Sequence, residues 1–236
     1  MKELEVFIPP PVNKPEIRES TEWSNFWIDS ASTVGGGRIL LIGDSTARMI
    51  RSTLAREVGR PVDLLASSSA PFDSLFINQV DCFFKSTTLY HYDCCFVQIG
   101  VHGRFNTESD VLFDADAERY KQNILGLCKY LEQITDKVIV ETIFLTVKPK
   151  KKELKYVSDM GLFKYVRGFI NDIPDEEKNR FQKKKNEVIR SLKDTQNVLD
   201  ICSLMEQYKY KKYDHIHYER DAYRVITRYM IQAISK

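Results

Sequence analysis

A serine near the start of this sequence stands where it could act as a nucleophile. Gly43-Asp44-Ser45 closes an apolar run, residues 38–43, and comes directly before a stretch with helical spacing. A serine on such a strand-to-helix turn presents its hydroxyl near the positive end of a helix, where developing negative charge is favoured. The triplet alone is not specific, because a serine at this place commonly caps the helix.

A carboxylate and an imidazole lie close together near the other end of the chain, in Tyr213-Asp214-His215-Ile216-His217. One turn can place Asp214 on the His217 ring nitrogen that faces away from a serine, which fixes the tautomer and stabilises the imidazolium. Taken singly, Asp214 could cap a helix and His217 could be a surface histidine. Together with Ser45 they favour a catalytic triad, with His217 rather than His215 as the base.

The elements that must position these residues alternate along the chain. Apolar, β-branched runs predict strands at 38–43, 62–66, 94–100, 137–145 and 198–204. Helical spacing predicts helices at 47–58, 74–84, 115–134 and 221–234. This alternation indicates a mostly parallel sheet covered on both faces, with ligands bound beyond the carboxyl ends of the strands. Ser45 follows the first of these strands and His217 follows the last.

At this point the sequence resembles the SGNH or GDSL-type hydrolases. Gly43-Asp44-Ser45 is similar to the first block of that family, and Asp214-x-x-His217 is similar to its last block, in the same order. The resemblance covers about residues 38–235. It implies a three-layer α/β/α sandwich of flavodoxin-like type with a mostly parallel five-stranded sheet. It also implies Ser45 as nucleophile, His217 as base and Asp214 as the group that orients it, with no cofactor and no metal.

Two blocks depart from the family pattern. The second block normally supplies a glycine, but residues 65–70 read LASSSA, so a backbone N–H of Ser68 or Ser69 is expected to serve the oxyanion hole. The third block is usually Gly-x-Asn-Asp, whose Asn donates to the oxyanion. Here His102 stands in the place of that Asn, within Gly100-Val101-His102-Gly103-Arg104.

The residues of these two blocks form the expected oxyanion and substrate-binding group: Ser69, Gly100, His102 and Arg104. A suitably protonated His102 can donate a hydrogen bond to an oxyanion, and Arg104 is the next candidate. Gly-x-His at this block is similar to the relatives that handle O-acetyl groups on glycans. The alternative is that His102 is only a loop residue and the hole is degraded.

Two functions follow from this site. The first is a serine-dependent esterase that removes or transfers an ester-linked acyl group, with acetyl on a carbohydrate expected, through an acyl-enzyme. The second is a catalytically idle SGNH-like domain that binds a glycan or a protein partner. The triad does not separate hydrolase from transferase, which would also need an acyl donor. The Gly-x-Ser-x-Gly turn of the other α/β-hydrolases is absent, because its fifth position is Ala47.

The chain divides into a leader, residues 1–36, and a catalytic domain, residues 37–236. Three prolines at 9–11 exclude regular structure there, and the aromatic residues at 23–27 are expected to pack the leader on the body. Residues 146–195 are rich in charge and predict an insertion plus a surface helix. Their lysine runs are expected to be solvated.

Composition limits the remaining partners. Lys and Arg number 35 and Asp and Glu 33, a net charge of +2 that calls for no nucleic acid. The five cysteines form no CxxC pair, which favours reduced thiols over disulfides or a zinc site. No apolar run approaches the roughly 20 residues of a membrane span, and no signal-peptide core is present. The sequence therefore predicts a cytoplasmic protein acting on a small-molecule or glycan ester, and it leaves the oligomeric state open.

Overall fold

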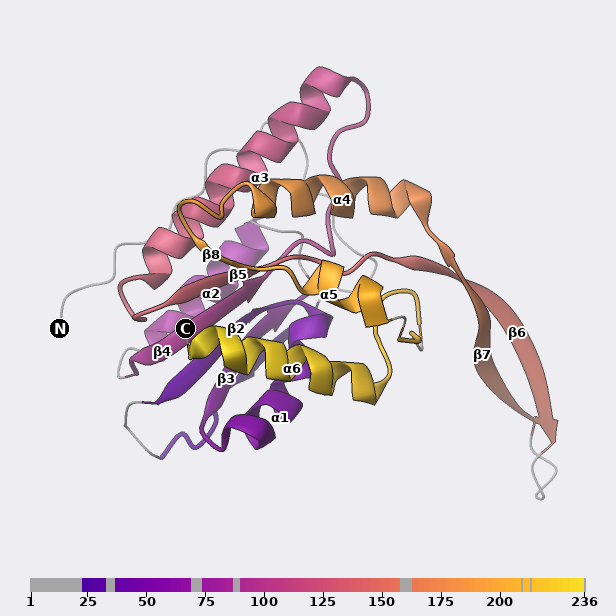
Figure 1. Ribbon diagram of the computed structural model, residues 1–236, viewed down its shortest axis with the longest axis horizontal. Helices are drawn as coiled ribbons and strands as arrows, with labels where there is room; N and C mark the ends of the chain where they lie inside the picture. Colours follow the sequence, from indigo (N-terminus) through magenta and orange to yellow (C-terminus); the bar gives the residue numbers. More distant parts are fainter. Residues whose placement is uncertain are drawn as a thin grey trace.

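The structure is a computed structural model that describes residues 23–32, 37–68, 74–86, 90–157, 163–208, 210–212 and 214–235 (Figure 1). Its central sheet has six strands in the order β1-β3-β2-β4-β5-β8. Their bounds are β1 Ser24–Trp27, β2 Arg38–Gly43, β3 Val62–Ser67, β4 Tyr92–Gln98, β5 Val138–Glu141 and β8 Asn197–Leu199. All neighbours pair in parallel except β1 and β3. The five parallel strands follow the flavodoxin-like order 2-1-3-4-5, which confirms the predicted fold class.

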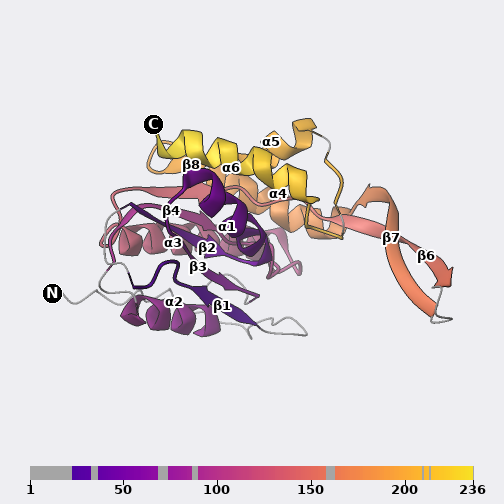
Figure 2. The same ribbon diagram turned by 90° about the horizontal axis from the view of Figure 1, so that it is seen from below.

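Helices cover both faces of the sheet (Figures 1 and 2). One face packs against α2 (Ser74–Ser86), α3 (Asp110–Leu131) and α4 (Glu176–Arg190). The other face packs against α1 (Ser45–Val58), α5 (Ile201–Tyr208) and α6 (Arg220–Ile234). Side chains alternate along β2, so that Leu40 and Ile42 enter the first layer and Ile39 and Leu41 enter the second. The continuous apolar run of this strand thus reflects burial on both faces.

The edge strand β1 is a difference from the prediction, which had five strands. It runs antiparallel to β3, with Ser24 opposite Ser67 and Trp27 opposite Leu64. Phe26 packs edge-on against Phe83 of α2, with ring centroids 5.6 Å apart. The four residues of β1 have no clear alternation of their own, and the pairing with β3 provides their strand conformation.

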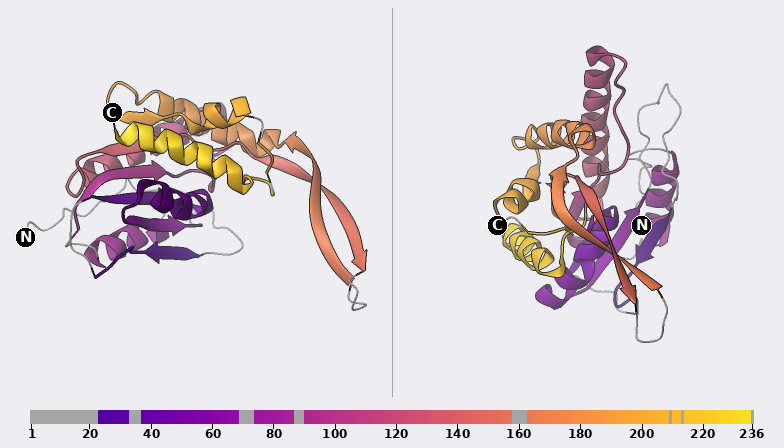
Figure 3. Two further views of the ribbon diagram at one scale, coloured as in Figure 1. Left: turned by 60° about the horizontal axis from the view of Figure 1, so that its bottom comes forward. Right: turned by 90° about the vertical axis from the view of Figure 1, so that its right-hand side faces the viewer.

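The charged segment 146–195 contains two different structures. β6 (Val147–Val157) and β7 (Phe163–Pro174) form an antiparallel two-stranded sheet that extends away from the body (Figures 1 and 3). The sequence predicts an insertion here but no hairpin. The predicted helix exists as α4, but it packs on the body, and Lys185 in its lysine run is only 1% exposed. The expectation that this run is solvated is therefore wrong at Lys185.

The predicted strand at 198–204 is also too long. β8 ends at Leu199, and α5 begins at Ile201. Asp200 causes the change, because its carboxylate accepts a hydrogen bond from the N–H of Ser203 at 3.1 Å, as a helix N-cap does.

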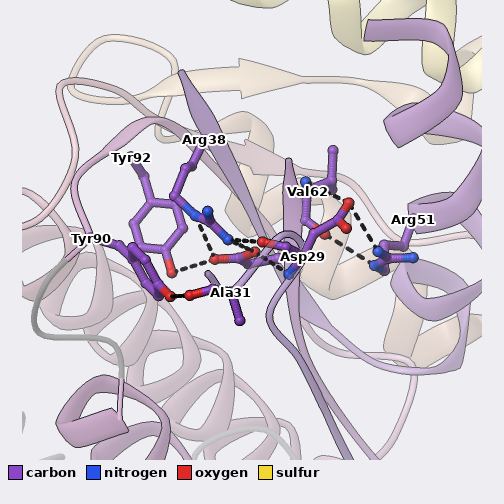
Figure 4. Close-up of polar contacts among 8 residues, drawn as sticks. Asp29, Ala31, Arg38, Arg51, Val62, Tyr90 and Tyr92 are labelled. Atoms are coloured by element: carbon purple, nitrogen blue, oxygen red, sulfur yellow. Dashed lines mark hydrogen bonds and ion pairs between the residues drawn. The ribbon is translucent and has the colours of Figure 1, made fainter. Parts of the chain in front are cut away.

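A buried ion pair fixes the beginning of β2 (Figure 4). Arg38 is fully buried and donates to both carboxylate oxygens of Asp63, at 2.6 and 3.1 Å. The hydroxyl of Tyr92 donates to the same carboxylate at 2.9 Å, and Arg38 also reaches the carbonyl of Asp29. These contacts join the beginnings of β2, β3 and β4 to the segment after β1. They lie at the amino-terminal ends of the parallel strands, and Ser45 follows the opposite, carboxyl end of β2.

Candidate active site

Ser45 lies on a tight turn between β2 and α1, and its two preceding residues explain the turn. A Cβ on Gly43 would lie 2.6 Å from the Gln98 carbonyl oxygen, so the close approach of β4 requires glycine here. Asp44 caps the helix, since its carboxylate accepts a hydrogen bond from the N–H of Thr46 at 2.8 Å. Ser45 is then the first residue of α1, at the positive end of the helix.

His217 reaches this turn from the segment that precedes α6. The carboxylate of Asp214 accepts hydrogen bonds from the N–H groups of Ile216 at 2.8 Å and His217 at 2.7 Å, which curls the chain into one turn. The other carboxylate oxygen lies 2.6 Å from His217 Nδ1. His217 Nε2 lies 2.6 Å from Ser45 Oγ. With the proton on Nδ1, the ring donates to Asp214 and accepts from the serine hydroxyl.

Asp214 supplies the negative charge of the Ser45–His217–Asp214 group. Burial disfavours its ionised form, but the hydrogen bonds from the His217 ring and from two backbone N–H groups outweigh burial and lower its pKa to about 2. Asp214 is therefore an anion at neutral pH, facing the imidazole. The side chains of His217 and Asp214 are 14% and 27% exposed, so the group is sheltered yet open to a ligand.

His215 lies near the group without joining it. Its carbonyl accepts a hydrogen bond from the N–H of Val147, and the described residues provide no hydrogen bond to its ring. Burial is the largest cause that lowers the pKa of His215, and electrostatic interaction with Lys178 lowers it further, whereas the carboxylate of Asp214 acts in the opposite direction. The structure thus brings Ser45 together with His217 and not with His215.

The third block forms the loop after β4, residues 100–104. Gly100 has φ +144°, and a Cβ there would come within 2.4 Å of Ile143 Cδ1 and 2.9 Å of the Tyr120 hydroxyl, so only glycine fits. Its carbonyl accepts a hydrogen bond from Lys185. Arg104 is exposed and forms an ion pair with Glu177 of α4 at 3.2 Å.

The second block differs from the prediction. The N–H of Ser68 donates to the Trp23 carbonyl at 3.1 Å, and its hydroxyl accepts from the Trp23 N–H at 2.7 Å. The expected use of the Ser68 N–H in an oxyanion hole is therefore wrong, because the chain entering β1 already uses it. Ser69 lies outside the described residues.

Sequence reasoning missed the polar side chains that α4 turns toward the body. Asn179, Gln182, Lys185 and Asn186 are all buried and bond to backbone atoms beyond their own helix. Their spacing follows one helical face, which is the available signal. A helical face of polar residues normally predicts exposure to solvent, so the pattern predicted the opposite of the burial that the structure has.

The described part of the chain contains neither a metal-binding cluster nor a helix that could span a membrane. No group of three or more His, Cys, Asp and Glu side chains is placed to hold a metal ion there. None of the helices described is both long enough and apolar enough to cross a membrane.

Comparison with known proteins gives matches at the level of structure alone. No protein-family model and no curated protein matches the chain. A protein assigned as an acylhydrolase, from Bacteroides fragilis, is 15% identical with a TM-score of 0.53, over 84% of this chain and 86% of that one. An α/β hydrolase from the metagenome of Lake Arreo, Spain, is 15% identical with a TM-score of 0.51, over 85% and 96%.

A third solved structure is a catalytic mutant of an acetylxylan esterase from Geobacillus stearothermophilus. It is 13% identical with a TM-score of 0.50, and the match covers 86% of this chain and 96% of that one. At these identities the likeness shows a shared fold. The chain therefore has the three-layer α/β fold of these hydrolases, as its resemblance to the SGNH type predicts.

Proposed function

We propose that the protein is a serine-dependent acyl esterase or acyltransferase in which Ser45 is the nucleophile, His217 the base and Asp214 the group that orients it. The observation that carries this proposal is the unbroken contact from Ser45 Oγ to His217 to Asp214, with 2.6 Å at each step. The three residues come from two ends of the chain, and neither a helix cap nor a surface histidine needs that arrangement.

The proposed reaction follows from this geometry. Ser45 Oγ attacks the ester carbonyl carbon while its proton passes to His217 Nε2. The tetrahedral intermediate collapses, the bond to the alcohol oxygen breaks, and His217 returns the proton to that oxygen. Water, or an acceptor hydroxyl, then attacks the acyl carbon of the acyl-Ser45 ester while its own proton passes to His217. The bond between the acyl carbon and Ser45 Oγ breaks, and His217 returns the proton to that oxygen. The products are an acid or a transferred ester, with Ser45 restored.

The negative oxygen of the intermediate needs donors. The first N–H groups of a helix have no acceptor within the helix, so the N–H of Ser45 can supply one donor. The family's usual Asn is replaced by His102, which we propose as the second, with Arg104 and the Gly100 turn as further contacts. Ser69 stays a proposed contribution from the second block.

An acetylated carbohydrate is the substrate class to test first. Gly100-Val101-His102 resembles the block of relatives that handle O-acetyl groups, and one protein of this fold is an acetylxylan esterase. A second function, an idle domain that binds a glycan or a protein, is favoured by one observation, the absence of Asn at the third block.

A fluorophosphonate probe separates these two functions, because it forms a covalent bond only with an activated serine. The intact protein should be labelled at Ser45, as located by peptide mass spectrometry, and Ser45→Ala should not. Release of acetate from p-nitrophenyl acetate and from acetylated xylo-oligosaccharides then tests turnover, and an added sugar acceptor tests transfer. A protein that neither labels nor turns over any ester contradicts the proposal and supports the binding domain.

A further inference from the structure

Lys185 of α4 is a buried lysine whose Nζ donates all its hydrogen bonds to one loop. Its side chain is 1% exposed, and its Nζ donates to the carbonyl oxygens of Gly100, His102 and Gly103 at 2.7, 3.1 and 2.9 Å. All three acceptors belong to the loop that follows β4, which is the third block of the candidate site. A buried ammonium is costly unless its donors are satisfied, and here the loop satisfies all three.

The geometry fits the protonated form of the lysine. An ammonium has three N–H donors and a neutral amine has two, and three carbonyl oxygens surround Nζ. Within the described residues no carboxylate lies at ion-pair distance from Nζ. Burial lowers the pKa of Lys185 to about 7, and the carboxylate of Asp44 acts against this shift.

The three contacts also decide where the N–H groups of the loop point. A trans peptide unit holds its C=O and N–H in opposite directions. The N–H groups of Val101, Gly103 and Arg104 share peptide units with the three bound carbonyls, so they point away from Lys185. Among the described residues, none accepts a hydrogen bond from these three groups. The loop thus keeps open donors beside the turn that bears Ser45.

Helix α4 is itself fixed to the segment that follows β5, and it can act as a rigid support. The amide of Asn186 accepts from the Ile143 N–H at 2.7 Å and donates to the Ile143 carbonyl at 2.8 Å. Gln182, one turn before Lys185, donates to the Val101 carbonyl at 3.2 Å. Gln182 and Lys185 together bind four successive carbonyls, those of residues 100–103, from one helix face.

We propose that Lys185 is a positioning residue that holds the Gly100–Arg104 loop in the conformation in which its hydrogen-bond donors face an ester bound at Ser45. This inference rests on the proposed esterase function. Lys185 touches neither substrate nor nucleophile in this role, and it acts through the loop. The preorganisation of such donors is a large part of the stabilisation of an acyl-transfer transition state.

The test compares Lys185→Met with Lys184→Met in the full chain. Methionine keeps an unbranched chain of similar length and removes the donors. Lys184 is the adjacent residue, 31% exposed and paired with Asp114 at 2.8 Å, so it matches the change in charge without contact to the loop. For Lys185→Met we expect kcat on p-nitrophenyl acetate to fall at least tenfold, toward the ~10²–10³-fold loss that follows removal of one oxyanion donor. KM should stay within about twofold, since ground-state binding is little changed.

A boronic acid supplies a second readout that a merely structural role would not move. It forms a tetrahedral adduct with an active serine and so imitates the intermediate. Its inhibition constant should weaken in Lys185→Met by about the same factor as kcat/KM, and it should be unchanged in Lys184→Met. If Lys185→Met unfolds, Gln182→Leu removes only the contact with Val101, and a smaller loss of kcat at constant KM is expected.

The outcomes separate this inference from the proposed function. A wild type that neither labels nor turns over esters overturns both. If the wild type is active and folded Lys185→Met retains its kcat and its boronate inhibition, the role of Lys185 alone is overturned. Where Lys185→Met unfolds, the same result in Gln182→Leu overturns it. Equal losses in Lys184→Met and Lys185→Met would also overturn it, because the effect would then follow helix charge and not the loop contacts.

Discussion

At the residue scale, the two histidines that flank Ile216 have different surroundings, and this difference predicts different phenotypes. His217 lies between Ser45 and Asp214, whereas His215 has its backbone bound to Val147. His217→Ala should abolish ester turnover, and His215→Ala should retain most of it. Steady-state rates of the two variants, compared at equal folded fraction, check this. Retained turnover in His217→Ala, with loss in His215→Ala, would reverse the assignment.

The substitution of His102 for the usual Asn gives a second test at this scale. If His102 donates to the oxyanion, His102→Ala should lower kcat by ~10²–10³-fold, about 3–4 kcal/mol, and leave KM nearly unchanged. His102→Asn should recover part of the rate, because it restores an amide donor. A wild-type kcat in His102→Ala would mean that the backbone N–H groups of Ser45 and of the loop suffice.

At the scale of elements, the position of the start of β2 depends on the buried ion pair between Arg38 and Asp63. Replacing Arg38 by methionine leaves the carboxylate of Asp63 buried without its cation. Loss of one member of a buried pair costs ~3–5 kcal/mol, and urea unfolding should show a reduction of that size. Arg60→Met removes the cation of the half-buried pair with Asp93, whose side chains keep about a third of their surface in water, and it should cost ~0–1 kcal/mol. Similar losses of unfolding free energy in both variants would contradict a larger contribution from the buried pair of Arg38.

At the scale of the whole molecule, stability should depend on pH through Glu141. This carboxyl is buried at the end of β5, one of its oxygens is without a hydrogen-bond partner among the described residues, and burial raises its pKa to about 8. The unfolded chain ionises the same group near pH 4. The protonated carboxyl therefore favours the folded state fully below about pH 4, and this contribution is lost as pH rises to about 8.

Glu141→Gln removes that titration and keeps a similar shape. The free energy of unfolding of the variant minus that of the wild type should rise between pH 5 and pH 8 and then level off. Glu118→Gln, at an exposed position of α3, is the matched control and should give a flat difference. A flat difference for Glu141→Gln as well would contradict the assignment of the pH dependence to this carboxyl.

Much of the architecture could be predicted from local sequence. The apolar runs at 38–43 and 94–98 predict buried strands because both faces of a parallel strand are covered, and the structure has strands there. The pairing of Ser45 with His217 could be anticipated because both follow parallel strands of one sheet, and the carboxyl ends of those strands lie at the same end of the sheet. Gly43 and Asp44 are also local, since one permits the close turn and the other caps the helix.

What only the tertiary structure decided concerns contacts between segments far apart in the chain. Trp23 and Ser68 are separated by 45 positions, and their mutual hydrogen bonds create the edge strand and occupy a donor that the sequence left available. Lys185 and Gly100 are separated by 85 positions, and nothing in a run of three lysines marks one as buried. Periodicity reports which face of a helix is apolar, but a polar side chain is buried whenever distant backbone groups offer it enough hydrogen bonds. That balance exists only after the chain has folded.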